Sequence, residues 1–236
     1  PDRAFYCEWK TFPDYMRILS KAAGQEISDF SSLMGALEKR LAFFAEFGTT
    51  VSDNGIAHIA WEDYTAAQVE DIFRKAAAGE RLSREAINRY KSAFLIEMAK
   101  LYKKYNFVMQ LHIGTYLDAN HRKVREIGQS TGFDCVDDST AVKSVGQILD
   151  RLTELDHLPK TILYPLNPAQ MEPFAVLAAG FCDGMVRGKV QLGAPWWFND
   201  QLGELVERGE YFSDEKYLKD IIEGICYRNV KEYFGW

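Results

Sequence analysis

Cysteine and histidine are both scarce, with four of each among 236 residues. The cysteines, at 7, 135, 182 and 226, form no CxxC pair, and no histidine stands at zinc-finger spacing from them. A disulfide scaffold and a structural zinc site are therefore not indicated. We expect reduced thiols, with Cys135 and Cys182 as small packing residues.

Blocks of basic residues and long apolar runs are also missing. The formal net charge is -6, which argues against a role in binding nucleic acid or a polybasic membrane surface. No run approaches the roughly 18 apolar residues of a membrane helix, and no signal peptide opens the chain. We expect a cytoplasmic protein with no nucleic-acid or membrane partner.

Several common catalytic signatures are absent. The sequence has no glycine-rich phosphate loop, no GxSxG, no HExxH and no two histidines two residues apart, so the standard nucleotide, hydrolase and zinc motifs are all lacking. The composition, 47% hydrophobic and 26% charged, is that of an ordinary globular protein. Without repeats or a linker, residues 1–236 are expected to form one domain.

The most informative stretch runs from Phe107 to Gly114. It is an apolar run of strand length that ends in an imidazole and a glycine, and it follows a long helical pattern. Ligands gather at the carboxyl ends of parallel strands. We therefore expect His112 and the polar loop at 115–139 to lie where chemistry is done, with that loop forming a wall or lid.

Strand and helix patterns alternate along the chain, which predicts an α/β fold with a parallel sheet and crossover helices. A pair of helices within about 56–105 resembles an elaborated connection between two strands, and no strand is visible after Asp200. Because a closed barrel needs eight strands, the four found here predict an incomplete one. The expected strands are 49–52, 107–114, 161–166 and 189–193, and the expected helices are 29–47, 65–78, 83–106, 139–155, 167–182 and one that begins at Ser213.

One histidine and one Asp-Asn pair are candidates for chemistry. His112 is a metal ligand, a general acid or base, or a hydrogen-bond donor to substrate, and the alternative is a buried histidine satisfied by backbone. Asp53 and Asn54 are either a site pair or a turn that ends a short strand, and propensity favours the turn. The remaining histidines are expected at the surface, at His58, His121 and His157.

A polar and aromatic cluster follows the last predicted strand. Of Trp196 and Trp197, one is expected in the core because successive strand side chains face opposite ways. The other could form the wall of a sugar pocket, while Asn199 or Asp200 binds hydroxyl groups.

Several motifs in order resemble uronate (glucuronate) isomerase. They are Met109-Gln-Leu-His-Ile-Gly114, Thr131-Gly-Phe-Asp134, Leu158-Pro-Lys-Thr-Ile-Leu-Tyr164, Leu166-Asn-Pro168 and Trp196-Trp-Phe-Asn-Asp200. The resemblance implies the amidohydrolase superfamily and a distorted (β/α)8, TIM-type barrel. It also implies the interconversion of D-glucuronate with D-fructuronate, and of galacturonate with tagaturonate, through an enediol. The resemblance further implies a divalent metal, which we expect to be zinc. It also implies a hexuronate substrate and a homo-oligomer.

The sequence departs from that family in three places. The family's His-x-His metal pair and a substrate-contacting arginine fall upstream of Pro1, and its eighth-strand Asp-Ser-Arg, with a metal-ligand aspartate that is also the expected base, falls after Asp200. We therefore expect that the N-terminal part and a segment after Gln201 are absent here. Asn54 stands where similar proteins often have histidine.

Three functions follow from these observations. The first is a uronate isomerase in which His112 and Asp53 are catalytic, Trp196, Trp197, Asn199 and Asp200 bind substrate, and the metal ligands lie outside this sequence. The second is a related amidohydrolase that hydrolyses its substrate with metal-activated water. The third is a fragment without catalytic activity.

Overall fold

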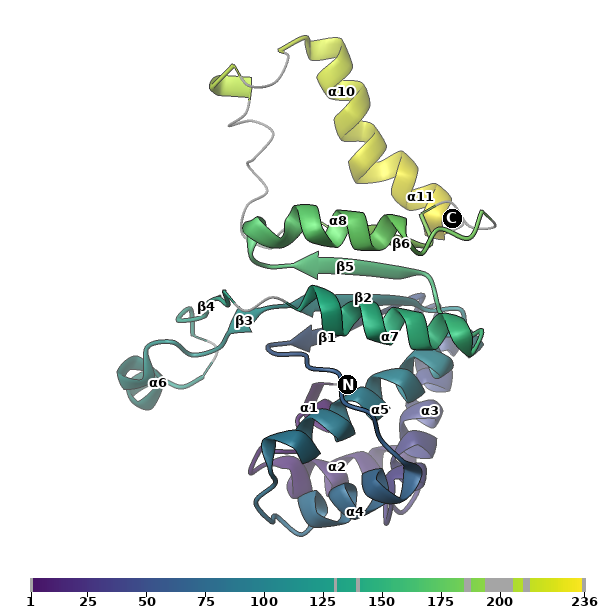
Figure 1. The fold of residues 1–236 in the computed structure, drawn as a ribbon, viewed down its shortest axis with the longest axis vertical. Coiled ribbons are helices and arrows are strands. Elements are labelled where there is room, and N and C mark those ends of the chain that lie inside the picture. The colour runs from purple at the N-terminus through teal and green to yellow at the C-terminus, as the bar shows by residue number, and fades with distance from the viewer. Residues whose placement is uncertain are drawn as a thin grey trace.

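The computed structural model describes residues 2–129, 131–138, 141–184, 188–193, 206–209 and 213–234. Within them, four parallel strands form one sheet in the order β1-β2-β5-β6 (Figure 1). Each strand therefore pairs with the next sheet strand along the chain, as successive β/α units of a barrel do. The strands are β1 (Val51–Ile56), β2 (Val108–Ile113), β5 (Thr161–Pro165) and β6 (Val190–Leu192).

Helices precede, separate and follow the strands of the sheet (Figure 1). Before β1 come α1 (Asp2–Phe5), α2 (Phe12–Ala23) and α3 (Phe30–Glu46), and between β1 and β2 come α4 (Ala66–Ala77) and α5 (Arg84–Lys104). The helix α7 (Val142–Glu154) precedes β5, and the 3-10 turn η1 (Pro168–Gln170) and α8 (Met171–Ala179) precede β6. The described C-terminal elements are α10 (Glu215–Glu223), the π-helical turn η2 (Gly224–Arg228) and α11 (Asn229–Phe234).

Side-chain caps fix where several helices begin. Thr65 and Gln68 form a capping box at the start of α4, and Ser83 accepts a hydrogen bond from the backbone N–H of Ala86 at the start of α5. Asn167 caps η1. These predicted starts are confirmed because each side chain satisfies an N–H that has no partner inside the helix.

The last helix differs from its prediction. Its cap is Asp214 rather than Ser213, because the Asp214 carboxylate accepts hydrogen bonds from the backbone N–H groups of Lys216 and Tyr217. No residue of α10 is buried, and the side chains of Tyr217 and Ile222 are exposed. Figure 1 shows why: α10 stands away from the sheet.

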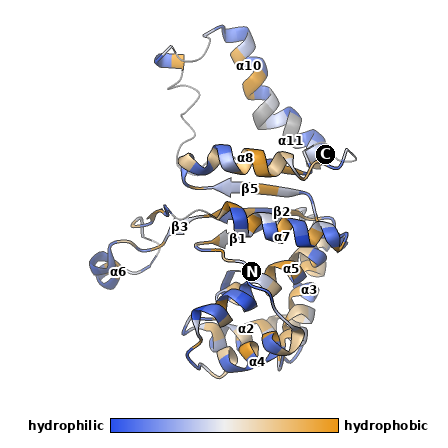
Figure 2. Ribbon diagram, in the orientation of Figure 1, coloured by the Kyte–Doolittle hydropathy of each residue, from blue (hydrophilic) through white to orange (hydrophobic). Residues whose placement is uncertain are grey.

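The segment predicted as a polar loop at 115–139 has structure of its own. Two short strands, β3 (Thr115–Tyr116) and β4 (Cys135–Val136), form an antiparallel ribbon that carries α6 (His121–Ile127). Asn120 caps α6 with its side-chain oxygen. None of the residues of α6 is buried. The ribbon and α6 project from the body of the molecule, and α6 is mostly hydrophilic (Figures 1 and 2).

The main core lies between the sheet and the helices that cover it. Helix α5 contributes Tyr90, Phe94 and Met98 to this core, and their side chains are at most 1% exposed. Cys7 is buried in this core, whereas Cys135 and Cys182 are exposed, so their prediction as packing residues is wrong. Cys135 lies on the projecting ribbon and Cys182 follows α8, and in the described part of the chain neither side chain is covered. No helix among the described residues is long and apolar enough to cross a membrane.

Strand β1 is longer than its sequence indicates. The prediction of a turn at Asp53-Asn54-Gly55 is wrong, because all three residues pair with β2, opposite Gln110, Leu111 and His112. Parallel pairing therefore overrides the turn propensity of Asp, Asn and Gly. As a result, Asp53 projects from a fixed strand rather than from a loop.

Candidate functional site

Alternation along the strands sorts the polar side chains onto two faces. In β1, Ser52, Asn54 and Ile56 are buried, whereas Asp53 between them is exposed. In β2, Gln110 and His112 are half-buried between buried neighbours. Because side chains two residues apart share a face, Gln110 and His112 share one face of β2 and are within contact distance of groups from both neighbouring strands.

His112 and Asp53 form the central contact. Nδ1 of His112 lies 2.6 Å from Oδ1 of Asp53, and the two side chains are 28% and 63% exposed. An ionised carboxylate can only accept a hydrogen bond, so Nδ1 donates. In the neutral imidazole the lone pair then lies on Nε2, which is the arrangement of a histidine oriented for proton exchange or ligation.

The electrostatics of Asp53 agree with that assignment. The hydrogen bond from His112 is the largest influence and lowers the pKa of Asp53 below its ordinary value of 3.8, against the opposing effect of partial burial. Asp53 is therefore a carboxylate at neutral pH. It can keep the Nδ1 proton of His112 in place.

Asp2 adds a second carboxylate close to this pair. Its Oδ1 accepts a hydrogen bond from the backbone N–H of Gly55 at 3.2 Å. Burial raises the pKa of Asp2, the charge of Asp53 raises it further and His112 lowers it. Since Gly55 is the register partner of His112, the N-terminal helix is attached beside the site.

Tyr164 of β5 covers one face of the imidazole. The rings of His112 and Tyr164, which are register partners, stack with centroids 4.4 Å apart and planes 17° apart. Gln110 Nε2 donates a hydrogen bond to the Tyr164 hydroxyl at 3.1 Å. Burial raises the pKa of Tyr164, so the phenol is neutral. Three strands thus contribute to one polar cluster.

Asn54 is structural. Its Nδ2 donates to the backbone oxygen of Gln110 at 3.0 Å, and its Oδ1 accepts from the Tyr102 hydroxyl at 3.1 Å. The side chain is 4% exposed. The interpretation of Asp53 and Asn54 as a site pair is therefore wrong for Asn54, because it faces α5 rather than His112.

Four of the predicted site residues cannot be placed relative to this cluster. Trp196, Trp197, Asn199 and Asp200 lie outside the described residues. His58 and His121 are exposed and His157 is half-buried, which confirms the first two as surface residues. Burial is the largest influence on His58 and lowers its pKa.

A metal site is not complete in the part of the chain that the structure describes. Nowhere in that part do three or more His, Cys, Asp or Glu side chains come together as a group that could hold a metal ion. Asp53 and His112 supply at most part of such a donor set.

Sequence reasoning missed three residues of the cluster. Gln110 lies two residues before His112 on the same face of β2, and Tyr164 is the register partner of His112 on β5. The alternation of side chains along a strand predicts the first, and an alignment of the predicted strand ends would have found the second. Asp2 carries no such signal, because its place beside Gly55 depends on a contact between residues 53 positions apart.

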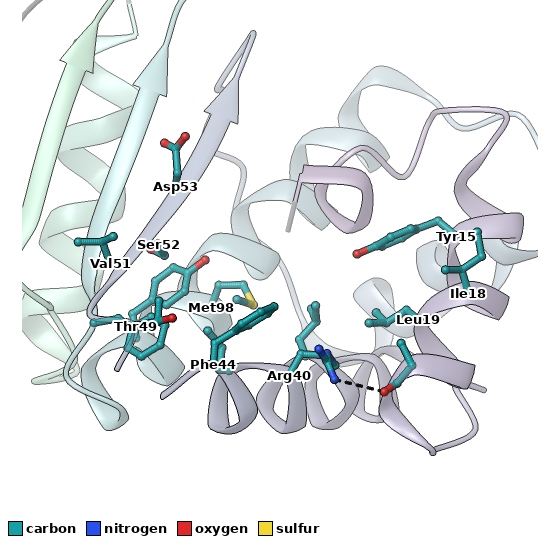
Figure 3. A pocket seen from close by; sticks show the side chains of 15 residues that line it. Tyr15, Ile18, Leu19, Arg40, Phe44, Thr49, Val51, Ser52, Asp53 and Met98 are labelled. Carbon is teal, nitrogen blue, oxygen red and sulfur yellow. Dashed lines mark hydrogen bonds between the residues drawn. The ribbon is translucent and has the colours of Figure 1, made fainter. Parts of the chain in front are cut away.

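A cleft adjoins the cluster on the side of β1 that faces α2 and α3. Its volume is about 420 Å³, and it lies between that strand and helices α2 and α3. Figure 3 shows Tyr15 and Leu19 of α2 across the cleft from Val51 and Asp53 of β1. The lining is mostly apolar, and Asp53 and Arg40 are its charged side chains.

Consecutive parallel β/α units with polar side chains at the strand ends are the arrangement of part of a (β/α) barrel. A family model described as glucuronate isomerase matches residues 1–203. The chain belongs to the glucuronate isomerase family.

Curated relatives agree with this family. The uronate isomerases of Lachnospira eligens and Shouchella clausii are each 34% identical over 282 aligned positions, which include all of this chain. The chain spans 60% of the length of each relative. Because the aligned positions outnumber the 236 residues, the relatives contain residues within the aligned region that this chain lacks.

Solved structures support the fold. A uronate isomerase from Thermotoga maritima matches with a TM-score of 0.74 and 28% identity over 85% of this chain and 43% of its own. A glucuronate isomerase from Caulobacter crescentus matches with a TM-score of 0.81 and 20% identity over 100% of this chain and 57% of its own. The incomplete TIM-type barrel expected from the sequence is confirmed.

Proposed function

We propose that the protein is a uronate isomerase that interconverts D-glucuronate with D-fructuronate, and D-galacturonate with D-tagaturonate. The reaction is an intramolecular aldose-ketose isomerisation. A proton moves between C2 and C1 through an enediol, while the carbonyl and hydroxyl oxygens exchange roles. Such a reaction needs a positioned acid-base group and stabilisation of the developing oxyanion.

The observation that carries the proposal is the contact between His112 and Asp53. It joins two neighbouring strands, and His112 lies near the carboxyl end of its strand, within the segment that matches the family. In the proposed role, His112 exchanges a proton with substrate through Nε2. Asp53 holds the ring through Nδ1 and does not itself take up the proton.

Residues outside the described part complete the proposed pocket. One of Trp196 and Trp197 stacks on the sugar, and Asn199 or Asp200 binds its hydroxyl groups. A divalent metal, zinc by preference, is proposed to act as a Lewis acid when bound, with ligands beyond the described residues. We also propose one barrel domain, with α4 and α5 as its elaboration, and a homo-oligomer in the cytoplasm.

The test is conversion of uronates by the protein purified from its natural source, with divalent metal supplied. Formation of the keto product from glucuronate or galacturonate supports the proposal. A protein that binds metal but converts neither uronate would refute it.

Other results of the same test would identify one of two other functions. Consumption of an ester or amide substrate with no isomerisation would identify a hydrolase that uses metal-activated water. An intact mass equal to that of the 27.0 kDa chain, together with no metal binding and no turnover, would identify a non-catalytic fragment.

A further inference from the structure

We propose that Tyr164 is a positioning residue that holds the His112 ring in the orientation required for proton exchange. This inference rests on the proposed function for its catalytic meaning, but the contact itself can be tested without turnover. Tyr164 acts through His112 and is not proposed to touch substrate.

The need for a positioning residue follows from the torsion of histidine. The last torsion of a histidine side chain is broad and roughly two-fold, so a ring held at one edge can rotate. Asp53 holds only the Nδ1 edge, and its side chain is 63% exposed on the outermost described strand of the sheet. A flat group packed against the ring face opposes that rotation.

Tyr164 has this geometry. Its ring lies nearly parallel to the imidazole, 17° between planes and 4.4 Å between centroids. The hydrogen bond from Gln110 to its hydroxyl fixes the far end of the phenol at 3.1 Å. Gln110 and His112 are two residues apart on β2, so one strand carries both the imidazole that Tyr164 covers and the amide that binds its hydroxyl.

Gly193 provides the space that the phenol ring occupies. A Cβ atom at Gly193 would lie 1.9 Å from Cε1 and 2.2 Å from Cδ1 of Tyr164. These are ring atoms, so any larger residue would displace the whole phenol rather than a flexible tip. The glycine remains paired with β5 through a hydrogen bond from its N–H to the Leu163 oxygen at 2.8 Å.

The direct test is imidazole NMR on the 236-residue chain labelled with ¹⁵N-histidine, at neutral to mildly alkaline pH. The sequence has four histidines, and His112→Gln assigns the signal of interest. In the wild type we expect His112 as the Nδ1–H tautomer, with its carbon-bound ring protons shifted upfield by the Tyr164 ring current.

Three variants separate the contributions. Tyr164→Leu should abolish the upfield shift and mix the tautomers, whereas Tyr164→Phe should keep the shift, because only the Gln110 bond is lost. Gly193→Ala should displace the ring and reduce the shift with both partners unchanged. Tyr217→Leu on α10 and Gly146→Ala on α7 are the matched controls, and both should leave His112 unchanged.

Turnover of the natural protein gives the second readout. Tyr164→Leu should lower kcat by about 100-fold with KM nearly unchanged, since a misplaced group loses rate rather than binding. Unchanged His112 shifts and tautomer in both Tyr164→Leu and Gly193→Ala would overturn the inference. If the NMR effects occur in a protein without isomerase activity, the proposed function fails while the positioning of His112 stands.

Discussion

Among single residues, the candidate site consists first of a carboxylate and an imidazole that strand pairing brings together. Asp53 and His112 are 59 positions apart in the sequence, yet Oδ1 and Nδ1 lie within hydrogen-bond distance. The sequence predicted each residue from its place near a strand end. Their contact depends on the register of β1 against β2, which requires a strand at positions where turn-forming residues argued against one.

Asp53→Asn should weaken turnover without unfolding the protein. The neutral amide of asparagine accepts a weaker hydrogen bond from Nδ1 than the charged carboxylate does. The tautomer and orientation of His112 are then less well defined. We expect kcat of the natural protein to fall by about 10- to 100-fold, the range typical for partners that orient a functional histidine. Asp14→Asn, which removes the exposed partner of Arg17 on α2, is the control, and an equal loss in both variants would contradict the role.

The same carboxylate predicts a pH dependence of stability. Because the pKa of Asp53 is lower in the folded protein than its ordinary 3.8, its contribution is complete above about pH 3.8 and is lost as pH falls through the lowered value. The side chain is more than half exposed, so the contribution is at most about 1 kcal/mol. Urea unfolding of wild type and Asp53→Asn should differ at neutral pH and converge in acid; a difference that grows in acid would reverse the sign.

At the scale of elements, β1 is attached to the rest of the fold by a buried amide. Asn54 bonds both to β2 and to Tyr102 of α5. Asn54→Ala should lower the free energy of unfolding by about 1–3 kcal/mol, because it removes one hydrogen bond to the buried Tyr102 hydroxyl and one to the Gln110 backbone oxygen. In the double variant with Tyr102→Phe the loss should be smaller than the sum of the two single losses. Strict additivity in denaturant unfolding would contradict the shared bond.

Local sequence signals predicted many helix and strand boundaries, but they predicted less well which side chains are buried. Capping residues such as Thr65 and Ser83 act within one turn, so the sequence alone locates them. The apolar face of α10 shows the opposite case, because its periodicity predicts a buried side that the described residues do not provide. Exposed Cys135 was missed for the same reason: burial depends on what packs against a segment.

At the scale of the whole molecule, stability should be distributed unevenly. The core lies between the sheet and helices such as α5, while α6 and α10 bury no residue. Native-state hydrogen exchange should therefore protect α5 amides up to the global unfolding free energy, and those of α6 and α10 far less. Equal protection in all three helices would show that α6 and α10 pack against a surface of the molecule or of another copy.

The family was predictable from the sequence because several motifs occur in a fixed order, and the family match at 1–203 confirms it. The fold followed from the alternation of strands and helices. The polar cluster was only partly predictable, because Asp2 reaches it through a contact with Gly55 from a distant helix. The substrate-binding residues expected after β6 lie beyond the described part, so their role remains a proposal.

The central claim is that His112 exchanges a proton with the uronate substrate. The most direct measurement is proton NMR of glucuronate incubated in D₂O with the natural protein, comparing wild type and His112→Gln. We expect that wild type forms the keto product with solvent deuterium on the sugar, and that His112→Gln is slower by about 100-fold or more while the protein stays folded. Equal rates in the two proteins would contradict it.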